Sequence, residues 1–454
     1  MTNLPTDRAT TLKEAFRKCD VVPLEGDNLD KYYVDLSDVR RTEAIDEING
    51  MLEFLESGKF ETVVFTGHRG SGKSTELRRL EREWQKDYKV IYLEINEETD
   101  INDATYTDLY LIVIKQVEFT LRQLGLRFDK NLLTNFENWF KEVTKESEET
   151  VERSVSVSGE ASLGADAPFL AKLLVKLLAQ IRANSKDKKT IRQTLEQDVS
   201  RLKTDINNLL TDGTQKLIKK FAQAGKYQKG FLIIFDNMDL FPPEVGDRLF
   251  FDYAAQLQGL NCTLVYTVPI SVLCSPKNAS NTFVSPNVMP MVNIYRFEKA
   301  RIDLEYDDRG VNAIAQLIEK RVDIDAVFES REQLLELARM SGGHVRLLIQ
   351  MMRRACLTAN TRQHDKITAE DVEYAVQQEQ FNFERFIPED HYAILAKVCV
   401  QKDMEKNEIY QLMLFNVSVL EYQGETRWNY PNPIVKRIEK FKNAVDDLQA
   451  GENQ

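Results

Sequence analysis

The stretch Gly67-His68-Arg69-Gly70-Ser71-Gly72-Lys73-Ser74-Thr75 is the part of the sequence that decides the fold. It fits the pattern GxxxxGK[ST], whose glycines allow successive backbone amides to turn inward around an anion. A β-rich run over residues 61–66 precedes it, and a helix is expected to follow, whose positive end adds to the attraction. The stretch therefore predicts a phosphate-binding loop between a strand and a helix.

This loop predicts ATP and Mg²⁺ as ligands. Lys73 is expected to reach the β and γ phosphates, and Ser74 is expected to place its hydroxyl on Mg²⁺. Thr75 either supports the next phosphate or simply continues the helix. The candidate nucleotide-binding residues are Gly67, His68, Arg69, Gly70, Ser71, Gly72, Lys73, Ser74 and Thr75. An ordinary glycine turn is the alternative, which the strand and helix on either side disfavour.

A second motif lies about 160 residues further on. The apolar run over residues 231–235 ends in Asp236-Asn237-Met238-Asp239, as a Walker B strand does when it presents a carboxylate beside the phosphate loop. Asp236 is the expected Mg²⁺ partner, directly or through water. Asp239 either orients or deprotonates the attacking water, or caps a helix that begins near Pro243. Asn237 stands where many ATPases carry glutamate.

Two further polar residues complete the predicted constellation. Thr267 closes a strand predicted over residues 262–267, where it either senses the γ-phosphate or is a plain strand-end threonine. Arg346 follows a Gly-Gly-His-Val sequence and falls in the first turn of a predicted helix. It either reaches the nucleotide and couples its state to the angle between domains, or is a surface arginine.

Outward from these motifs, strands alternate with helices, which predicts an α/β fold with a parallel sheet between helical layers. Strands are expected over residues 61–66, 89–95, 230–235 and 262–267. Between the second and third strands, helices are expected over 106–124, 132–143 and 170–181, with an exposed hairpin over 155–163. Apolar residues then form one stripe on a single charged helix: Ile191, Leu195, Val199, Leu202, Ile206 and Leu209. Two interpretations stand: an arm inserted in the sheet domain, or an extra helical layer on its core.

The remaining pattern divides the chain into four parts. An irregular N-terminal extension is expected over 1–39, a P-loop domain over 40–300 with the arm at about 146–225, a helical lid over 301–380, and a winged-helix-like domain over 381–454. In the extension, residues 32–36 are expected to dock as an extended segment. In the last domain, the aromatic pair Trp428 and Tyr430 either stacks on a base or closes the domain's core, and we prefer the core.

Composition limits where the protein works and what it binds. The 454 residues include 72 acidic and 60 basic side chains, a formal charge of -12, so DNA would need a local basic patch. Residues 384–442 hold nine basic and nine acidic residues and lack such an excess. The five cysteines are scattered and odd in number, which indicates neither a disulfide framework nor a zinc site and suits a reducing cytosol. Without a long apolar run, we expect a cytoplasmic protein with no membrane partner.

The order of these motifs, followed by a winged-helix-like tail, resembles AAA+ ATPases, particularly their STAND-like and archaeal-initiator-like relatives, over roughly residues 40–430. By that resemblance, Lys73 and Ser74 belong to Walker A and Asp236 to Walker B, with Thr267 as sensor 1 and Arg346 as sensor 2. The resemblance also implies a homo-oligomer with ATP at subunit interfaces. The trans arginine of such an assembly has four candidates, each of which is otherwise a surface charge: Arg248, Arg296, Arg301 and Arg321.

The sequence thus leads to three hypotheses of function. The first is a slow ATPase switch that oligomerises and controls an effector or sensor protein, plausibly in antiviral defence, a common role of bacterial members of this group. The alternative is a DNA-loading ATPase of replication or transposition, supported by the winged-helix tail and a basic terminal helix with Lys436, Arg437, Lys440 and Lys442. The third is a scaffold that binds nucleotide without hydrolysis, which the presence of Asp236 and Asp239 disfavours.

Overall fold

The architecture is that of a computed structural model, which describes residues 7–144, 169–183, 188–277, 282–283 and 286–452. The predicted fold class is confirmed: a parallel sheet with a phosphate-binding loop, a helical lid and a C-terminal domain with a hairpin. The hairpin predicted over 155–163 lies outside the described residues. In the part of the chain that is described, no helix is both long and apolar enough to cross a bilayer.

Five parallel strands form the central sheet in the order β2-β3-β4-β1-β5. The strands are β1 (Thr62–Gly67), β2 (Lys89–Glu94), β3 (Phe231–Asp236), β4 (Thr263–Pro269) and β5 (Asn287–Met289). Strands β3 and β4 are buried at every residue, which explains their continuous apolar sequence. Because all strands run the same way, the residues that follow β1, β3 and β4 meet at one edge of the sheet.

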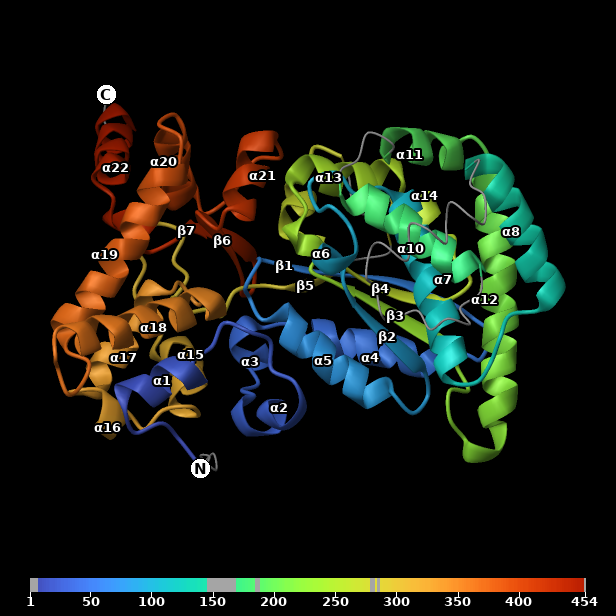
Figure 1. Ribbon diagram of the computed structural model, residues 1–454. Coiled ribbons are helices and arrows are strands. Elements are labelled where there is room, and N and C mark those ends of the chain that lie inside the picture. Colours follow the sequence, from blue (N-terminus) through green and yellow to red (C-terminus); the bar gives the residue numbers. More distant parts are fainter. Residues whose placement is uncertain (1–6, 145–168, 184–187, 278–281, 284–285, 453–454) are drawn as a thin grey trace.

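Helices cover both faces of this sheet (Figure 1). On one face lie α4 (Ala44–Phe54) and α5 (Lys73–Trp84), whose apolar residues share a core with β1 and β3. On the other face lie α7 (Tyr106–Gln123), α8 (Lys130–Thr144), α10 (Phe169–Arg182), α11 (Lys188–Glu196) and α12 (Val199–Phe221). Helix α7 is buried on nearly all sides because it lies between the sheet and this outer layer.

The prediction of one charged helix through residues 191–209 is wrong. The chain leaves the helix after α11, and Asp198 caps α12 by accepting a hydrogen bond from the backbone N–H of Arg201. The apolar stripe is divided between the two helices. Leu195, Leu202, Ile206 and Leu209 are fully buried in the core that α7 shares with the sheet, so the described part of this region is an extra helical layer and not a protruding arm.

The part of the chain after β5 is mostly helical and contains a two-stranded hairpin before its last helix (Figure 1). The lid helices are α15 (Asp308–Glu319), α16 (Ile324–Val327), α17 (Arg331–Met340), α18 (Val345–Thr361) and α19 (Ala369–Phe386). The elements after them are α20 (His391–Gln401), α21 (Glu408–Phe415), β6 (Val419–Gln423), β7 (Arg427–Pro431) and α22 (Glu439–Glu452). Trp428 is buried and stacks on Tyr422 with ring centroids 4.4 Å apart, which places it in the core as preferred.

The N-terminal extension is more ordered than predicted. It forms α1 (Leu12–Lys18), α2 (Gly26–Tyr32) and α3 (Ser37–Arg40), with an extended stretch at residues 33–36. Thr11 caps α1, and that helix packs on α18 with Ala15 buried in the lid core. The short apolar face of α1 escaped the sequence reasoning because a seven-residue helix carries too few turns to show a period.

Candidate nucleotide site

Lys73 lies at the start of α5 and is held inside the phosphate-binding loop, residues 67–75, called the P-loop below. Its side chain is 3% exposed, and Nζ donates hydrogen bonds to the carbonyl oxygens of Gly67 (2.9 Å) and His68 (2.8 Å). Nζ also forms an ion pair with Oδ2 of Asp239 at 2.7 Å. A triphosphate in this loop would therefore compete with Asp239 for the ammonium group.

Asp236 is the last residue of β3 and is 2% exposed. Its Oδ2 accepts a hydrogen bond from the hydroxyl of Tyr92 (2.6 Å), and its Oδ1 accepts one from the backbone N–H of Asn237 (2.7 Å). Burial and the Asp236 charge raise the pKa of Tyr92, so the phenol keeps its proton. A carboxylate has about four lone-pair sites, so both oxygens keep capacity for a metal ion.

Asp239 does not cap the helix after it. The N-cap of α13 (Pro243–Asp247) is Pro242, which has no side-chain hydrogen bond. The carboxylate of Asp239 instead meets Lys73, and both side chains are less than one tenth exposed. The capping interpretation is therefore wrong, and a role toward the attacking water stays a prediction.

Thr267 fastens β4 to the turn that follows β3. Its hydroxyl donates to the carbonyl oxygen of Phe235 (3.1 Å) and accepts from the backbone N–H of Met238 (2.9 Å). The residue is fully buried. These two bonds position the turn that carries Asp236 and Asp239, and the γ-phosphate sensor role stays a prediction.

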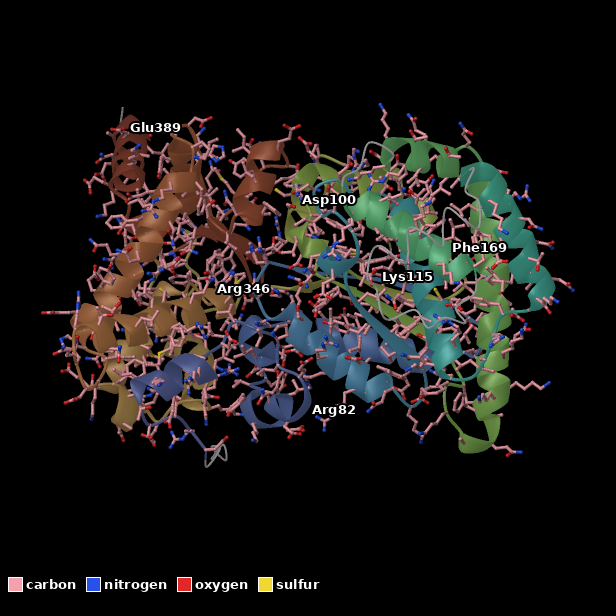
Figure 2. The ribbon with its side chains drawn as sticks, in the orientation of Figure 1. Arg82, Asp100, Lys115, Phe169, Arg346 and Glu389 are labelled. Carbon is pink, nitrogen blue, oxygen red and sulfur yellow. The ribbon has the colours of Figure 1, made fainter. Side chains whose placement is uncertain are left out.

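Arg346 meets the P-loop from the lid, at the junction of the two halves of the molecule (Figure 2). Its backbone N–H donates to the carbonyl oxygen of Gly70 at 3.1 Å, and its side chain lines the nucleotide cleft beside Arg69. Burial, with the Arg69 charge adding to it, lowers the pKa of Arg346. Gly70 has φ +82°, and a Cβ there would lie 2.7 Å from Cε1 of His344 and 2.8 Å from Cβ of Arg346. The lid therefore packs directly on this glycine.

Two buried histidines continue this contact. Nε2–H of His344 donates to the carbonyl oxygen of Arg69 (2.7 Å), while its Nδ1 caps α18 by accepting from the N–H of Leu347 (3.0 Å). Nε2 of His68 accepts from the backbone N–H of Glu421 in β6 (2.8 Å). Burial lowers the pKa of His344 to about 4 and that of His68 to about 3, so both rings are neutral. Residues 68, 69 and 70 are thus each hydrogen-bonded to the C-terminal half.

The N-terminal extension forms one wall of the cleft, which the sequence did not reveal. Leu24 donates its backbone N–H to Oγ1 of Thr75 (3.2 Å), and Nη2 of Arg40 donates to the carbonyl oxygen of Ser71 (2.6 Å). The cleft encloses about 550 Å³ including its open mouth. Its lining comprises Val21, Val22, Pro23, Arg69, Gly70, Gly72, Lys73, Ser74, Thr75, Asn237, Asp239, Leu240, Val345, Arg346 and Ile349. Apolar residues lie on one side of the cleft and cationic residues on the other. This arrangement suits a nucleotide, whose base has apolar ring faces and whose phosphates are charged.

Several of the residues proposed for other contacts have partners within the chain. Arg321 is 4% exposed and donates to the carbonyl oxygen of Leu317, so it cannot reach a neighbouring subunit and is wrong as a candidate trans arginine. The basic side chains proposed for DNA all form ion pairs: Lys436 with Asp303, Arg437 with Glu373, Lys440 with Glu389 and Lys442 with Glu439. Within the described residues no group of three or more His, Cys, Asp or Glu side chains could hold a metal ion alone.

Comparison with known proteins finds relatives among solved structures only, since no family model and no curated protein matches the sequence. The Aeropyrum pernix ORC2 protein is 14% identical, with 99% of this chain and 100% of that chain covered and a TM-score of 0.40. Cdc6p from Pyrobaculum aerophilum is 11% identical, with 92% and 95% covered and a TM-score of 0.37. The Walker-type ATPase paby2304 of Pyrococcus abyssi is 12% identical, with 92% and 99% covered and a TM-score of 0.40. The similar structures thus include an ORC2 protein, a Cdc6 protein and a Walker-type ATPase, and the likeness is one of fold.

Proposed function

We propose that this protein is a Mg²⁺-dependent ATPase that works as a slow switch. The observation that carries the proposal is the pairing of Lys73 with Asp239 at 2.7 Å inside a loop whose residues 68–70 are bonded to the lid and the C-terminal domain. ATP phosphates draw Lys73 away from Asp239, because they offer more negative charge than one carboxylate. The P-loop then changes shape, and its three bonds to the C-terminal half transmit that change.

The residues present suit a magnesium ion. Ser74 and Asp236 supply a hydroxyl and a carboxylate, and Mg²⁺ prefers such oxygen ligands with the rest from phosphates and water. When bound, the ion would neutralise charge on the β and γ phosphates. Lys73 and Arg346 would hold the same phosphates from the loop and from the lid. Asn237, in place of a glutamate, fits slow turnover and a switch better than a motor.

In this proposal other proteins bind differently to the ATP-bound and ATP-free conformations. We infer a homo-oligomer that controls an effector or sensor protein, with antiviral defence as the setting that the sequence resemblance suggests. The contacts between the P-loop and β6 support such a readout, because the C-terminal domain is bonded to the site itself.

DNA loading is the alternative function, and the C-terminal domain bears on it. Helix α21, which precedes the hairpin, packs on the ATPase domain: Nε2 of Gln411 donates to Oδ1 of Asp247 (3.0 Å) and to the carbonyl oxygen of Ser271 (3.2 Å). The basic side chains near the C-terminus also form ion pairs, those of Lys436 and Arg437 before α22 and that of Lys440 within it, and this arrangement favours protein contact over DNA. A duplex titration at low salt with ATP separates the two functions, because a DNA loader would bind and lose affinity steeply as salt rises.

The Lys73→Ala variant tests the proposed function. Loss of the buried ammonium is expected to lower ATP affinity at least about 30-fold, measured by calorimetry with Mg²⁺, and to abolish phosphate release. Lys86→Ala, at an exposed position just after α5, is the matched control and should behave as wild type. If Lys73→Ala bound ATP and assembled like wild type, the switch hypothesis would be abandoned.

A further inference from the structure

The carboxyl end of β2 carries an acid that the sequence motifs do not include. Glu94 is the last residue of β2, and its register partner in β3 is Asp236. Register partners on neighbouring parallel strands lie about 4.8 Å apart and point to the same face of the sheet. Glu94 therefore stands beside the carboxylate expected at the metal ion.

Glu94 is connected to the residue that replaces the usual glutamate. Nδ2 of Asn237 lies 3.4 Å from Oε2 of Glu94 and donates at 2.9 Å to Oδ1 of Asn96. Asn237 has φ +64°, a left-handed conformation that asparagine tolerates better than glutamate does. Asn237 also lines the nucleotide cleft. The turn after β3 has no glutamate at position 237, but Glu94 on the neighbouring strand contacts that turn through Asn237.

The two acids of the turn after β3 have other partners in this structure. Asp236 is bonded to Tyr92 and expected at the metal, and Asp239 is paired with Lys73 until ATP binds, which makes Asp239 the competing candidate for the water. The side chain of Glu94 is 37% exposed, so water reaches it, while Nη2 of Arg78 holds its Oε1 at 3.4 Å. Cζ of Arg78 lies over the ring of Tyr92, 3.6 Å from its centroid, and this contact holds the guanidinium group in place beside Glu94.

We propose that Glu94 is the catalytic carboxylate that orients and deprotonates the attacking water, with Asn237 as its positioning residue; this rests on the proposed ATPase function. As the bond between the water oxygen and Pγ forms, the bond between Pγ and the β–γ bridging oxygen breaks. One proton of the water passes to Glu94 and then to solvent. The electron pair of the broken bond leaves with ADP, and inorganic phosphate is the other product.

The Glu94→Gln variant tests this proposal because it keeps the size of the side chain and one acceptor oxygen for Arg78 or Asn237, and removes the charge. Phosphate release at saturating Mg²⁺ and ATP is expected to fall about 100-fold or more. ATP affinity, measured by calorimetry, is expected to stay within about 3-fold, because binding depends on the P-loop. Glu97→Gln, three residues on and exposed, is the matched control and should hydrolyse ATP at the wild-type rate.

A second variant exchanges the two side chains. Glu94→Asn combined with Asn237→Glu moves the carboxylate to the neighbouring strand end and is expected to recover at least about a tenth of the wild-type rate. If Glu94→Gln hydrolysed ATP at the wild-type rate, this inference would be overturned while the proposed ATPase function would stand. Loss of hydrolysis in Asp239→Asn would then assign the water to Asp239. A wild-type protein that binds no ATP, or never hydrolyses it, would overturn the proposed function and this inference with it.

Discussion

Two turns meet at the nucleotide cleft, and they are held in different ways. The Walker B turn, residues 236–239 after β3, is fastened by the neighbouring strands through Tyr92 on β2 and Thr267 on β4. The P-loop after β1 is held by other segments of the chain: Arg40 at the end of α3, His344 and Arg346 in the lid, and Glu421 in the C-terminal domain. The sheet therefore fixes the Walker B turn, while the P-loop is bonded to the end of α3, the lid and the C-terminal domain.

This difference shows where ATP can change the structure. Each hydrogen bond between residues 68–70 and the C-terminal half contributes about 1 kcal/mol net, so the three together contribute about 3 kcal/mol. Micromolar binding of a ligand corresponds to about 8 kcal/mol. ATP can therefore shift the position of the lid if a modest part of its binding energy depends on that position. The Walker B turn, fixed by the sheet, serves as the rigid side of the cleft.

The largest effect should come from Gly70→Ala, which disrupts the contact between the P-loop and the lid. The new Cβ would meet both His344 and Arg346 at less than 3.0 Å, and alanine is strained at φ +82°. We expect a loss of about 3 kcal/mol in unfolding free energy and a larger radius of gyration in X-ray scattering as the lid moves off the loop.

Gly58→Ala is the matched control, since Gly58 has φ +80° and nothing within 4 Å of an added Cβ. This variant should lose only the unfolding free energy due to backbone strain, about 1 kcal/mol, and its radius of gyration should not change. Equal losses in the two variants would mean that the lid contact at Gly70 contributes nothing to stability.

Sequence reasoning succeeded where the chemistry lies within a short stretch. The GxxxxGK[ST] pattern predicted the loop between β1 and α5, and the apolar run before Asp236 predicted β3, because burial on both faces leaves only apolar residues. The motif around Arg346 was visible for the same reason, since the glycine pair and the arginine lie within five consecutive residues.

What escaped prediction depends on which distant segments become neighbours. Glu94 is an ordinary strand-end acid until the strand order places β2 beside β3. His68 looks like a variable position of the P-loop pattern, and only the docking of β6 explains its burial. The pairing of Lys73 with Asp239 likewise could not be predicted, because it depends on the distance between two loops, and the spacing of residues in the sequence does not give that distance.

A smaller effect is expected on the Walker B side, from Thr267→Val. Valine has the same shape but leaves the carbonyl of Phe235 and the N–H of Met238 without their partner, at a cost of about 2 kcal/mol in unfolding free energy. Because this turn is fixed within the sheet, scattering dimensions and ATP affinity should not change. Thr267→Ser keeps the hydroxyl and should recover most of the loss in thermal unfolding. A variant that unfolds like wild type but hydrolyses ATP slowly would instead support the γ-phosphate sensor role.

The smallest effect concerns pH and isolates the burial of His344 between the lid and the P-loop. The pKa of His344 is about 4 in the folded protein against about 6.5 for an ordinary histidine, so between these values the unfolded chain binds a proton that the folded one does not. Its contribution to stability is complete above about pH 6.5 and falls as the pH drops toward 4. From about pH 7.5 to 5.5, wild type should lose about 1 kcal/mol more than His344→Asn, in which asparagine still caps α18. Urea unfolding at both pH values measures this difference, and parallel pH profiles would show that burial does not keep the imidazole neutral.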